Sequence, residues 1–282
     1  MILSMGVAFY LGCALYCAAG AAAILYLWRD HERVLDATIA LAGAGAACLA
    51  AAFAFRWIAW RLVPMTTAAD SIALFAVLST AVMLALMRKP NVRALACFYA
   101  PPLAALCIVN AAVAHTDLFT APRALAGLPL VLHVGMAFLA YALFFLAGMT
   151  SAAYVFQSQR LKRRHPTGLF QRLPSLEQLD STLIRLIGLG YPLFVLTLIL
   201  GAFWAHTQRD LLGPRWWLAP KVVLSFVLAI FCAVTYHRRR AGRLRGPRLA
   251  YQVFIGFIAL LAIYLILALL HLRTYNFWGA AS

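Results

Sequence analysis

The chain has 282 residues, of which 65% are hydrophobic and only 11% are charged, and its mean hydropathy is +0.88. Soluble globular domains usually contain about a quarter charged residues, so this composition excludes an ordinary water-soluble enzyme or binding domain. The net charge of +16 would suggest nucleic-acid binding in a soluble protein. In so apolar a chain it indicates the positively charged side of a membrane protein instead, and we expect no nucleic-acid partner.

Eight apolar segments are each long enough to cross a bilayer as a helix, which takes roughly 20 mainly apolar residues. They are long, rich in Ala and Leu, and lack the roughly ten-residue alternation of a membrane barrel. The sequence therefore predicts an all-α, polytopic transmembrane helix bundle of about eight spans. In chain order these cover about 3–27, 36–55, 68–87, 92–114, 128–156, 182–205, 216–236 and 249–272.

The connections between these segments are short, so we expect a single integral membrane domain over residues 1–282. The first segment lacks the basic start of a signal peptide and is too long for one, so we interpret it as a membrane helix. Two basic connections stand out, at about 157–181 and 237–248. In the first, Pro174 and Ser175 lead toward a predicted short amphipathic helix before the sixth span.

Basic residues of membrane proteins lie mainly on the cytoplasmic side. If both termini are outside, the connections after spans one, three, five and seven, with their helix ends, hold 17 of the 24 Lys and Arg residues on the cytoplasmic side. The sequence therefore predicts that both termini lie on the outer (periplasmic or extracellular) side. Anionic lipids are the expected partners of the two basic loops, with a cytoplasmic protein as the alternative.

The cysteines and the acidic residues indicate no catalytic chemistry. All six cysteines fall within predicted spans without a CxxC pair, so we interpret them as small packing residues. Asp70 and Asp180 lie near span ends, where capping or snorkelling explains them. No span carries a central acidic residue, which argues against an ion-coupled transporter.

Histidines are the most informative residues, because a membrane span has little reason to keep one without a function. His133 lies about one turn into the fifth span, and His271 lies in the last turn of the eighth. Two helices can present such imidazoles, at one depth, to one iron from opposite faces, which is the geometry of bis-histidine heme ligation. The alternative is that both are polar anchors at the membrane surface.

The outer connection at about 204–217 is rich in tryptophan, with Trp204, Trp216 and Trp217. Tryptophan is common at membrane interfaces as an anchor, which explains any one of the three. Together they also form an aromatic shelf that suits a flat apolar macrocycle, and Arg215 and Lys221 are candidate partners for its carboxylates.

Several motifs, in this order, resemble those of the cytochrome c assembly family, whose members include CcsA-, CcmC- and HemX-like proteins. The resemblance covers roughly residues 56–278. The motifs are Phe55-Arg56-Trp57, the opening of the fifth span from Leu132-His133 to Tyr141, Gly201-Ala202-Phe203-Trp204-Ala205, Trp216-Trp217-Leu218-Ala219-Pro220-Lys221, Tyr236-His237-Arg238 and Leu270-His271.

The resemblance implies that His133 and His271 ligate the iron of a non-covalent, b-type heme beside the tryptophan-rich segment. It also implies that His237, before the second basic loop, belongs to an inner heme site or uptake route, although composition alone favours His237 as a residue of the charged patch. The expected location is the bacterial inner (cytoplasmic) membrane. The expected partners are heme and a membrane protein of cytochrome c assembly.

This sequence also departs from the family pattern. The family segment Trp-x-Trp-Asp-Pro-Lys-Glu is degenerate here, because Leu218, Ala219 and Val222 replace the second Trp, the Asp and the Glu. The early inner histidine of the family is absent from the stretch 50–55. The chain thus resembles the shorter, stand-alone branch of the family more than the synthase that attaches heme to apocytochrome.

We therefore expect a heme-binding membrane protein, without enzymatic activity alone, that presents or transfers heme at the outer face or assists cytochrome c maturation. The alternative is a family scaffold that has lost heme transfer and acts as a regulatory or structural membrane partner. Such a scaffold would serve an enzyme of heme synthesis or an ion transporter.

Overall fold

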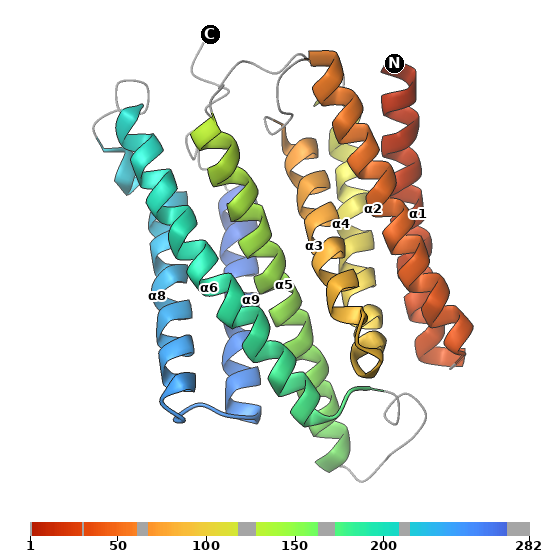
Figure 1. The fold of residues 1–282 in the computed structure, drawn as a ribbon, viewed down its shortest axis with the longest axis vertical. Coiled ribbons are helices and arrows are strands. Elements are labelled where there is room, and N and C mark those ends of the chain that lie inside the picture. Colours follow the sequence, from red (N-terminus) through yellow and green to blue (C-terminus); the bar gives the residue numbers. More distant parts are fainter. Residues whose placement is uncertain are drawn as a thin grey trace.

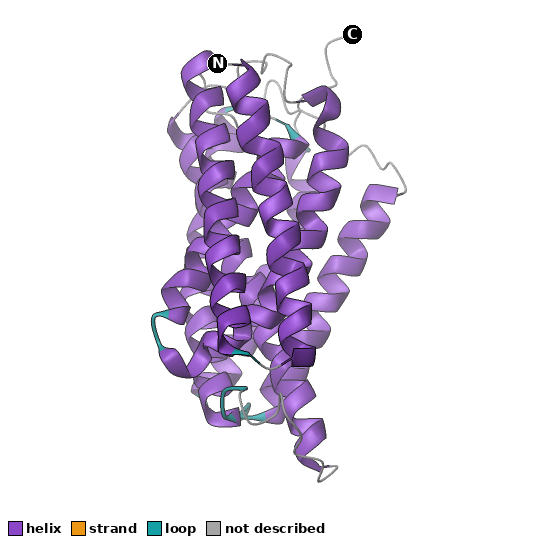
Figure 2. Ribbon diagram, turned by 90° about the vertical axis from the view of Figure 1, so that its right-hand side faces the viewer, coloured by secondary structure: helices purple, strands orange, loops and turns teal. Residues whose placement is uncertain are grey.

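The computed structural model describes residues 2–29, 31–60, 67–117, 128–162, 173–208 and 215–269. Every regular element in these ranges is helical, and the long helices run side by side along the longest axis of the molecule (Figures 1 and 2). The long helices are α1 (Ile2–Arg29), α2 (Glu32–Trp60), α3 (Ala68–Met87), α4 (Ala96–Asp117), α5 (Leu128–Lys162), α6 (Leu176–Thr207), α8 (Pro220–Arg240) and α9 (Pro247–Leu269).

The all-α, polytopic prediction is confirmed. Seven helices in the described part of the chain are long and apolar enough to cross a membrane, and α9 adds a helix of 23 residues. Each predicted span corresponds to one helix, although α5 and α6 reach 35 and 32 residues and extend well beyond the predicted ends. Within the described ranges, the 3-10 helices η1 (Pro90–Leu95) and η3 (Trp216–Leu218) precede α4 and α8.

The helices form two neighbouring groups (Figure 1). The first group contains α1, α2, α3 and α4, and the second contains α5, α6, α8 and α9. Helix α5 packs on α3 and joins the groups, with the rings of Phe75 and Phe145 5.6 Å apart. The predicted heme ligands belong to the second group.

Successive long helices are antiparallel, so the bundle has two distinct ends (Figure 1). At one end, α1 meets α2, α3 meets α4, α5 leads toward α6, and α8 turns into α9. We call it the basic end, because it carries Arg88, Arg160, Arg239 and the arginines around them. The other is the tryptophan end, which carries Trp204, Trp216 and Trp217.

The start of α6 differs from its prediction. The stretch after Pro174 is not a separate amphipathic helix, because Ser175 caps α6 itself and the helix continues unbroken to Thr207. The Ser175 hydroxyl accepts from the Gln178 backbone N–H at 3.2 Å, and the Gln178 side chain accepts from the Ser175 N–H at 3.0 Å. This reciprocal capping box satisfies two end groups and begins the helix there.

Polar side chains within the first group are paired across helices, as a low-dielectric interior requires. The Tyr16 hydroxyl of α1 lies 2.6 Å from the Thr80 hydroxyl and donates to the Ala76 carbonyl of α3 at 3.0 Å. Arg56 of α2 forms an ion pair with Asp70 of α3 at 3.2 Å, and both side chains are buried. The predicted capping role of Asp70 is confirmed, because it forms a capping box with Thr67.

In the second group, glycines admit rings from neighbouring helices. A Cβ atom on Gly148 of α5 would lie 2.5 Å from the Phe257 ring of α9, and one on Gly190 of α6 would lie 2.8 Å from the Phe144 ring of α5. One on Gly256 of α9 would lie 2.3 Å from the Phe231 ring of α8. Any side chain at these positions would force the helices apart, so the glycines determine how closely the group packs.

Candidate functional site

His133 lies on α5 at the tryptophan end, where its half-buried imidazole faces α6. Its Nδ1 atom is 2.9 Å from the backbone carbonyl oxygen of Thr197. Because this partner is a main-chain atom of a neighbouring helix, the imidazole is fixed by the backbone geometry of α6. His133 is therefore part of a helix interface rather than a polar side chain that only contacts the surroundings.

The hydrogen bond also decides which ring nitrogen is basic. A carbonyl oxygen can only accept, so Nδ1 carries the proton and donates it to Thr197. In the neutral imidazole, Nε2 then holds the lone pair. Metal-bound histidines typically donate their other N–H to a carbonyl or carboxylate in this way, which fixes the tautomer and the ring orientation. The geometry of His133 thus fits that of an axial iron ligand acting through Nε2.

Gly201 of α6 provides the space for this ring. A Cβ atom at Gly201 would lie 2.4 Å from Cε1, 2.8 Å from Nδ1 and 3.2 Å from Nε2 of His133. The imidazole therefore lies directly against the α6 backbone, one turn past Thr197. The His133 ring thus packs against a glycine in the same way as the phenylalanine rings do at Gly148, Gly190 and Gly256.

The predicted tryptophans all lie at the same end as His133. Trp204 is one turn beyond Gly201 in the last part of α6 and is half-buried. Trp216 and Trp217 form η3, immediately before α8, and Trp217 is 54% exposed. The described residues thus place aromatic side chains on both sides of the α6–α8 connection.

The predicted cationic partners are located less completely. Arg215 precedes η3 and is exposed. Lys221 lies in the first turn of α8, and its side chain is outside the described part of the structure. His115 and His206, which directly follow the predicted spans at about 92–114 and 182–205, lie in the last turns of α4 and α6.

His271 lies outside the described residues, but the backbone of α9 is described as far as Leu269, two residues before it. The ring of Phe257 lies 6.2 Å from that of Phe145. His133 lies twelve residues before Phe145 on α5, and Leu269, the last residue of α9, lies twelve residues after Phe257. Both steps lead from this contact toward the tryptophan end. Because antiparallel helices rise equally per residue, the end of α9 and His133 lie at about the same depth.

His237 lies far from His133, at the basic end of α8. Its imidazole is exposed, and its ring centre is 6.4 Å from that of Tyr191 on α6 and 5.7 Å from that of Tyr236. The structure therefore places His133 and His237 at opposite ends of the bundle.

Within the described residues, no group of three or more His, Cys, Asp and Glu side chains could hold a metal ion. A heme iron needs only axial ligands from the protein, because the porphyrin supplies the other four. His133 therefore fits an axial role, whereas nothing in the described residues fits a site built from side chains alone.

The comparisons with known proteins give the family. The model of the family described as cytochrome C assembly protein matches residues 65–273, about three quarters of the chain. The chain belongs to this family. Its match begins at α3 and includes His133, Gly201, Trp204 and His271.

Individual relatives in this family match shorter segments. Protein HemX of Brevibacillus brevis is 39% identical over 112 residues, which cover 39% of this chain and 40% of that protein. Protein HemX of Bacillus subtilis (strain 168) is 32% identical over 138 residues, 49% of each chain. Cytochrome c biogenesis protein CcsA of Synechococcus sp. (strain JA-3-3Ab) is 37% identical over 93 residues, 33% of this chain and 26% of that protein.

The chain thus matches half or less of the length of these relatives. No solved structure matches it.

Sequence reasoning missed Thr197, and it named Gly201 only as part of the motif that ends at Ala205, without its contact with His133. The acceptor at Thr197 is a backbone carbonyl, which every residue carries, so no sequence pattern could have indicated it. Gly201 did carry a signal, because a glycine inside a helix costs about 1 kcal/mol relative to alanine and usually has a packing or functional reason.

Proposed function

We propose that the protein binds a b-type heme non-covalently at the tryptophan end, with the iron held between His133 and His271. The observation that carries this proposal is the hydrogen bond of His133 Nδ1 to the Thr197 carbonyl, which leaves Nε2 as the basic nitrogen. When bound, heme supplies the redox-active iron. The chain's residues orient the ligand ring and cover the macrocycle.

Helix packing supports His271 as the second ligand. The α5–α9 register brings the end of α9 to about the depth of His133, and His271 follows two residues after Leu269. Two imidazoles on different helices at one depth can bind one iron from opposite faces. The proposal for His271 therefore follows from the register of α9.

Trp204, Trp216 and Trp217 would cover the apolar macrocycle, because their rings flank the α6–α8 connection at the same end. Arg215 and Lys221 would pair with the heme carboxylates. An arginine or lysine beside a carboxylate forms a charge-assisted hydrogen bond, which fixes the orientation of the ligand.

The proposed role is to present or transfer heme at the outer membrane face, or to assist c-type cytochrome maturation together with a membrane partner of that assembly. Both termini would lie outside a bacterial inner (cytoplasmic) membrane, since the arginine-rich end belongs on the cytoplasmic side. We propose no enzymatic activity for the chain alone, because Leu218, Ala219 and Val222 interrupt the family's tryptophan-rich segment.

The test is the visible spectrum of the protein purified in detergent, with and without added heme. We expect a Soret band and a sharp reduced α-band that are lost in His133→Ala and in His271→Ala. His206→Ala is the matched control, because His206 is an exposed histidine of α6 at the same end of the bundle as His133 and should be dispensable. A colourless protein after heme addition, or equal loss in the control, would refute the proposal.

A second candidate function is a scaffold that regulates or supports a membrane partner without transferring heme. The three substitutions in the tryptophan-rich segment favour it. It predicts that His133→Ala leaves complementation of a deletion strain intact, whereas heme handling predicts that complementation is lost. The same variant therefore separates the two functions.

We also propose that His237 contacts heme at the basic end during uptake. Its exposed imidazole lies edge-on to the ring of Tyr191, so a heme that approached His237 would have an aromatic side chain beside it. Because this position is at the opposite end from His133, His237→Ala should lower the amount of heme that the protein acquires in cells. It should leave the spectrum of protein loaded with heme in detergent unchanged.

A further inference from the structure

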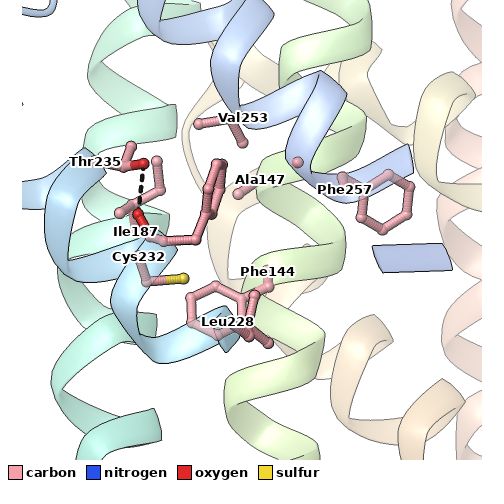
Figure 3. A pocket seen from close by; sticks show the side chains of 10 residues that line it. Phe144, Ala147, Ile187, Leu228, Cys232, Thr235, Val253 and Phe257 are labelled. Atoms are coloured by element: carbon pink, nitrogen blue, oxygen red, sulfur yellow. Dashed lines mark hydrogen bonds between the residues drawn. The ribbon is translucent and has the colours of Figure 1, made fainter. Parts of the chain in front are cut away.

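A cavity lies between the four helices of the second group (Figure 3). Most of its lining residues on α6, α8 and α9 belong to the half of each helix nearer the basic end. The cavity is small and partly open, and water-sized atoms can reach about 40 Å³ of space within it. Apolar side chains form the walls, and the Cys232 sulfur points toward the space (Figure 3). The lining residues named in Figure 3 are Phe144, Ala147, Ile187, Leu228, Cys232, Thr235, Val253 and Phe257.

We place the opening on the side of α8 and α9, where most of the partly exposed lining residues lie, beside the contact of the Phe231 ring with Gly256. Leu228 and Phe231 of α8 and Gly256 and Phe257 of α9 are partly exposed, as is Phe144 of α5, whereas Ala147, which forms the back wall on α5, is buried. In a chain whose helices cross a membrane, this opening faces lipid acyl chains. The cavity therefore suits a flexible aliphatic chain that enters sideways from the bilayer.

Polar groups close the cavity toward the basic end. The Thr235 hydroxyl donates to the Phe231 carbonyl at 2.8 Å and accepts from the Gln252 amide of α9 at 2.7 Å. This hydrogen bond joins α8 to α9 just beyond the apolar walls, which is the depth at which the ester groups of a lipid would follow its chain.

Cations continue on the same helix faces. Along α8 the cavity-lining residues are spaced as on one helix face, and the next positions on that face, three and four residues after Thr235, are Arg238 and Arg239. On α9, Arg248 lies four residues before Gln252 and therefore on the same face of the helix as Gln252. Both Arg238 and Arg248 are exposed.

The charges around this point are mainly positive. Arg239 is paired with Asp180 of α6 at 2.8 Å, so this arginine is largely neutralised. Arg240 donates to the Tyr236 hydroxyl at 3.1 Å. Among the ion pairs found within the described residues, Asp180 is the acidic partner at the α8–α9 turn, and the arginines there outnumber it, which leaves net positive charge at the cavity's basic end.

We infer that this cavity and these arginines form a site for one anionic phospholipid of the leaflet at the basic end. The end of one acyl chain enters the cavity from the side of α8 and α9. The phosphate lies between Arg238 and Arg248, which supply charge-assisted hydrogen bonds. The lipid would fill a packing gap between α8 and the helices that carry the proposed heme site.

The test is native mass spectrometry of the full-length protein in detergent, with phosphatidylglycerol and phosphatidylcholine of identical acyl chains. Phosphatidylglycerol should bind more tightly. In the double variant Arg238→Gln/Arg248→Gln its affinity should fall about 25-fold, since each basic residue near an anionic lipid contributes about fivefold. The control, Arg88→Gln/Lys89→Gln, removes the same charge from the exposed turn after α3 and should change the affinity less than twofold.

Ala147→Leu tests the cavity without changing charge, because the larger side chain would occupy the space that the acyl chain needs. It should weaken phosphatidylglycerol binding while the protein stays monodisperse. Equal binding of the two lipids, or an equal loss in the control pair, would overturn the site. So would an Ala147→Leu variant that keeps its lipid affinity but loses heme, because the cavity would then accommodate the porphyrin.

Discussion

The imidazole of His133 lies so close to the α-carbon of Gly201 that a Cβ atom there would be 2.4 Å from its Cε1. Real Cβ atoms are not found at such a distance from another heavy atom, so the ring can occupy this position only beside a glycine. The hydrogen bond from His133 to Thr197 holds the ring in the same place from one turn away. Residue 201 therefore controls the orientation of the proposed ligand without touching the iron.

Gly201→Ala should displace the His133 ring and lower heme occupancy at least tenfold, with a shifted or broadened Soret band. Gly135→Ala is the matched control, because Gly135 lies two residues from His133 and a Cβ atom there meets nothing within 4 Å. Both changes favour the helix by about 1 kcal/mol, so propensity cannot distinguish them. Heme titrations that give equal occupancy for the two variants would show that the Gly201 contact is unimportant for binding.

Thr197→Val should leave heme binding unchanged, because the carbonyl that orients His133 belongs to the backbone. The Thr197 hydroxyl donates to the Leu193 carbonyl within its own helix at 2.9 Å. Valine keeps the branched shape and removes only that local bond, so the expected cost in stability is about 1 kcal/mol. Absorption spectra of the loaded variant would test this. A changed spectrum would mean that the side chain, and not the carbonyl, positions the ring.

The buried ion pair of Arg56 and Asp70 should be important for folding. Asp70→Asn removes the negative charge but keeps an oxygen that can cap α3, so it leaves the buried guanidinium uncompensated. Breaking a buried pair in this way costs about 3–5 kcal/mol in the free energy of unfolding. Unfolding in mixed detergent would measure it, and the double variant Arg56→Met/Asp70→Asn should recover part of the loss. Additive effects of the two changes would contradict a coupled pair.

The exposed ion pair of Arg93 and Asp36 provides a contrast. These side chains are 39% and 57% exposed, and pairs of this kind contribute about 0–1 kcal/mol. Asp36→Asn should therefore barely change the unfolding midpoint, whereas Asp180→Asn, at the half-buried pair with Arg239, should lower it more. The same unfolding assay compares both variants. Equal shifts would mean that exposure does not distinguish the two pairs.

The helices could be predicted from sequence because apolar runs of some 20 residues have few alternatives in a membrane. Their ends could be predicted less well. The sixth span was expected from about 182, yet α6 begins at Leu176, because the capping box of Ser175 and Gln178 starts the helix within a polar stretch. Local capping there outweighed the hydropathy boundary.

The candidate site was predictable to the level of residue type but not of geometry. His133 stands out as a histidine within a span, and the tryptophans stand out by composition. The contact of His133 with α6 depends on which helices are neighbours, and no periodicity in the sequence specifies that. The same holds for the cavity, since its walls come from four helices that are distant along the chain.

Helix α9 links the proposed heme site to the packing of the second group, because His271 comes two residues after Leu269, its last described residue. Its position against α5 is fixed by the ring of Phe257 in the space left by Gly148. Gly148→Ala would force that ring outward and cost about 1–3 kcal/mol through overpacking. Because α9 then shifts relative to α5, heme bound per folded protein should fall, although Gly148 lies about four turns from His133.

Gly188→Ala is the control, because the nearest atom to a Cβ there would be a Tyr236 ring carbon at an ordinary contact distance of 3.9 Å. If Gly148→Ala lowers thermal stability but keeps full heme occupancy and an unchanged spectrum, α9 does not provide the second ligand.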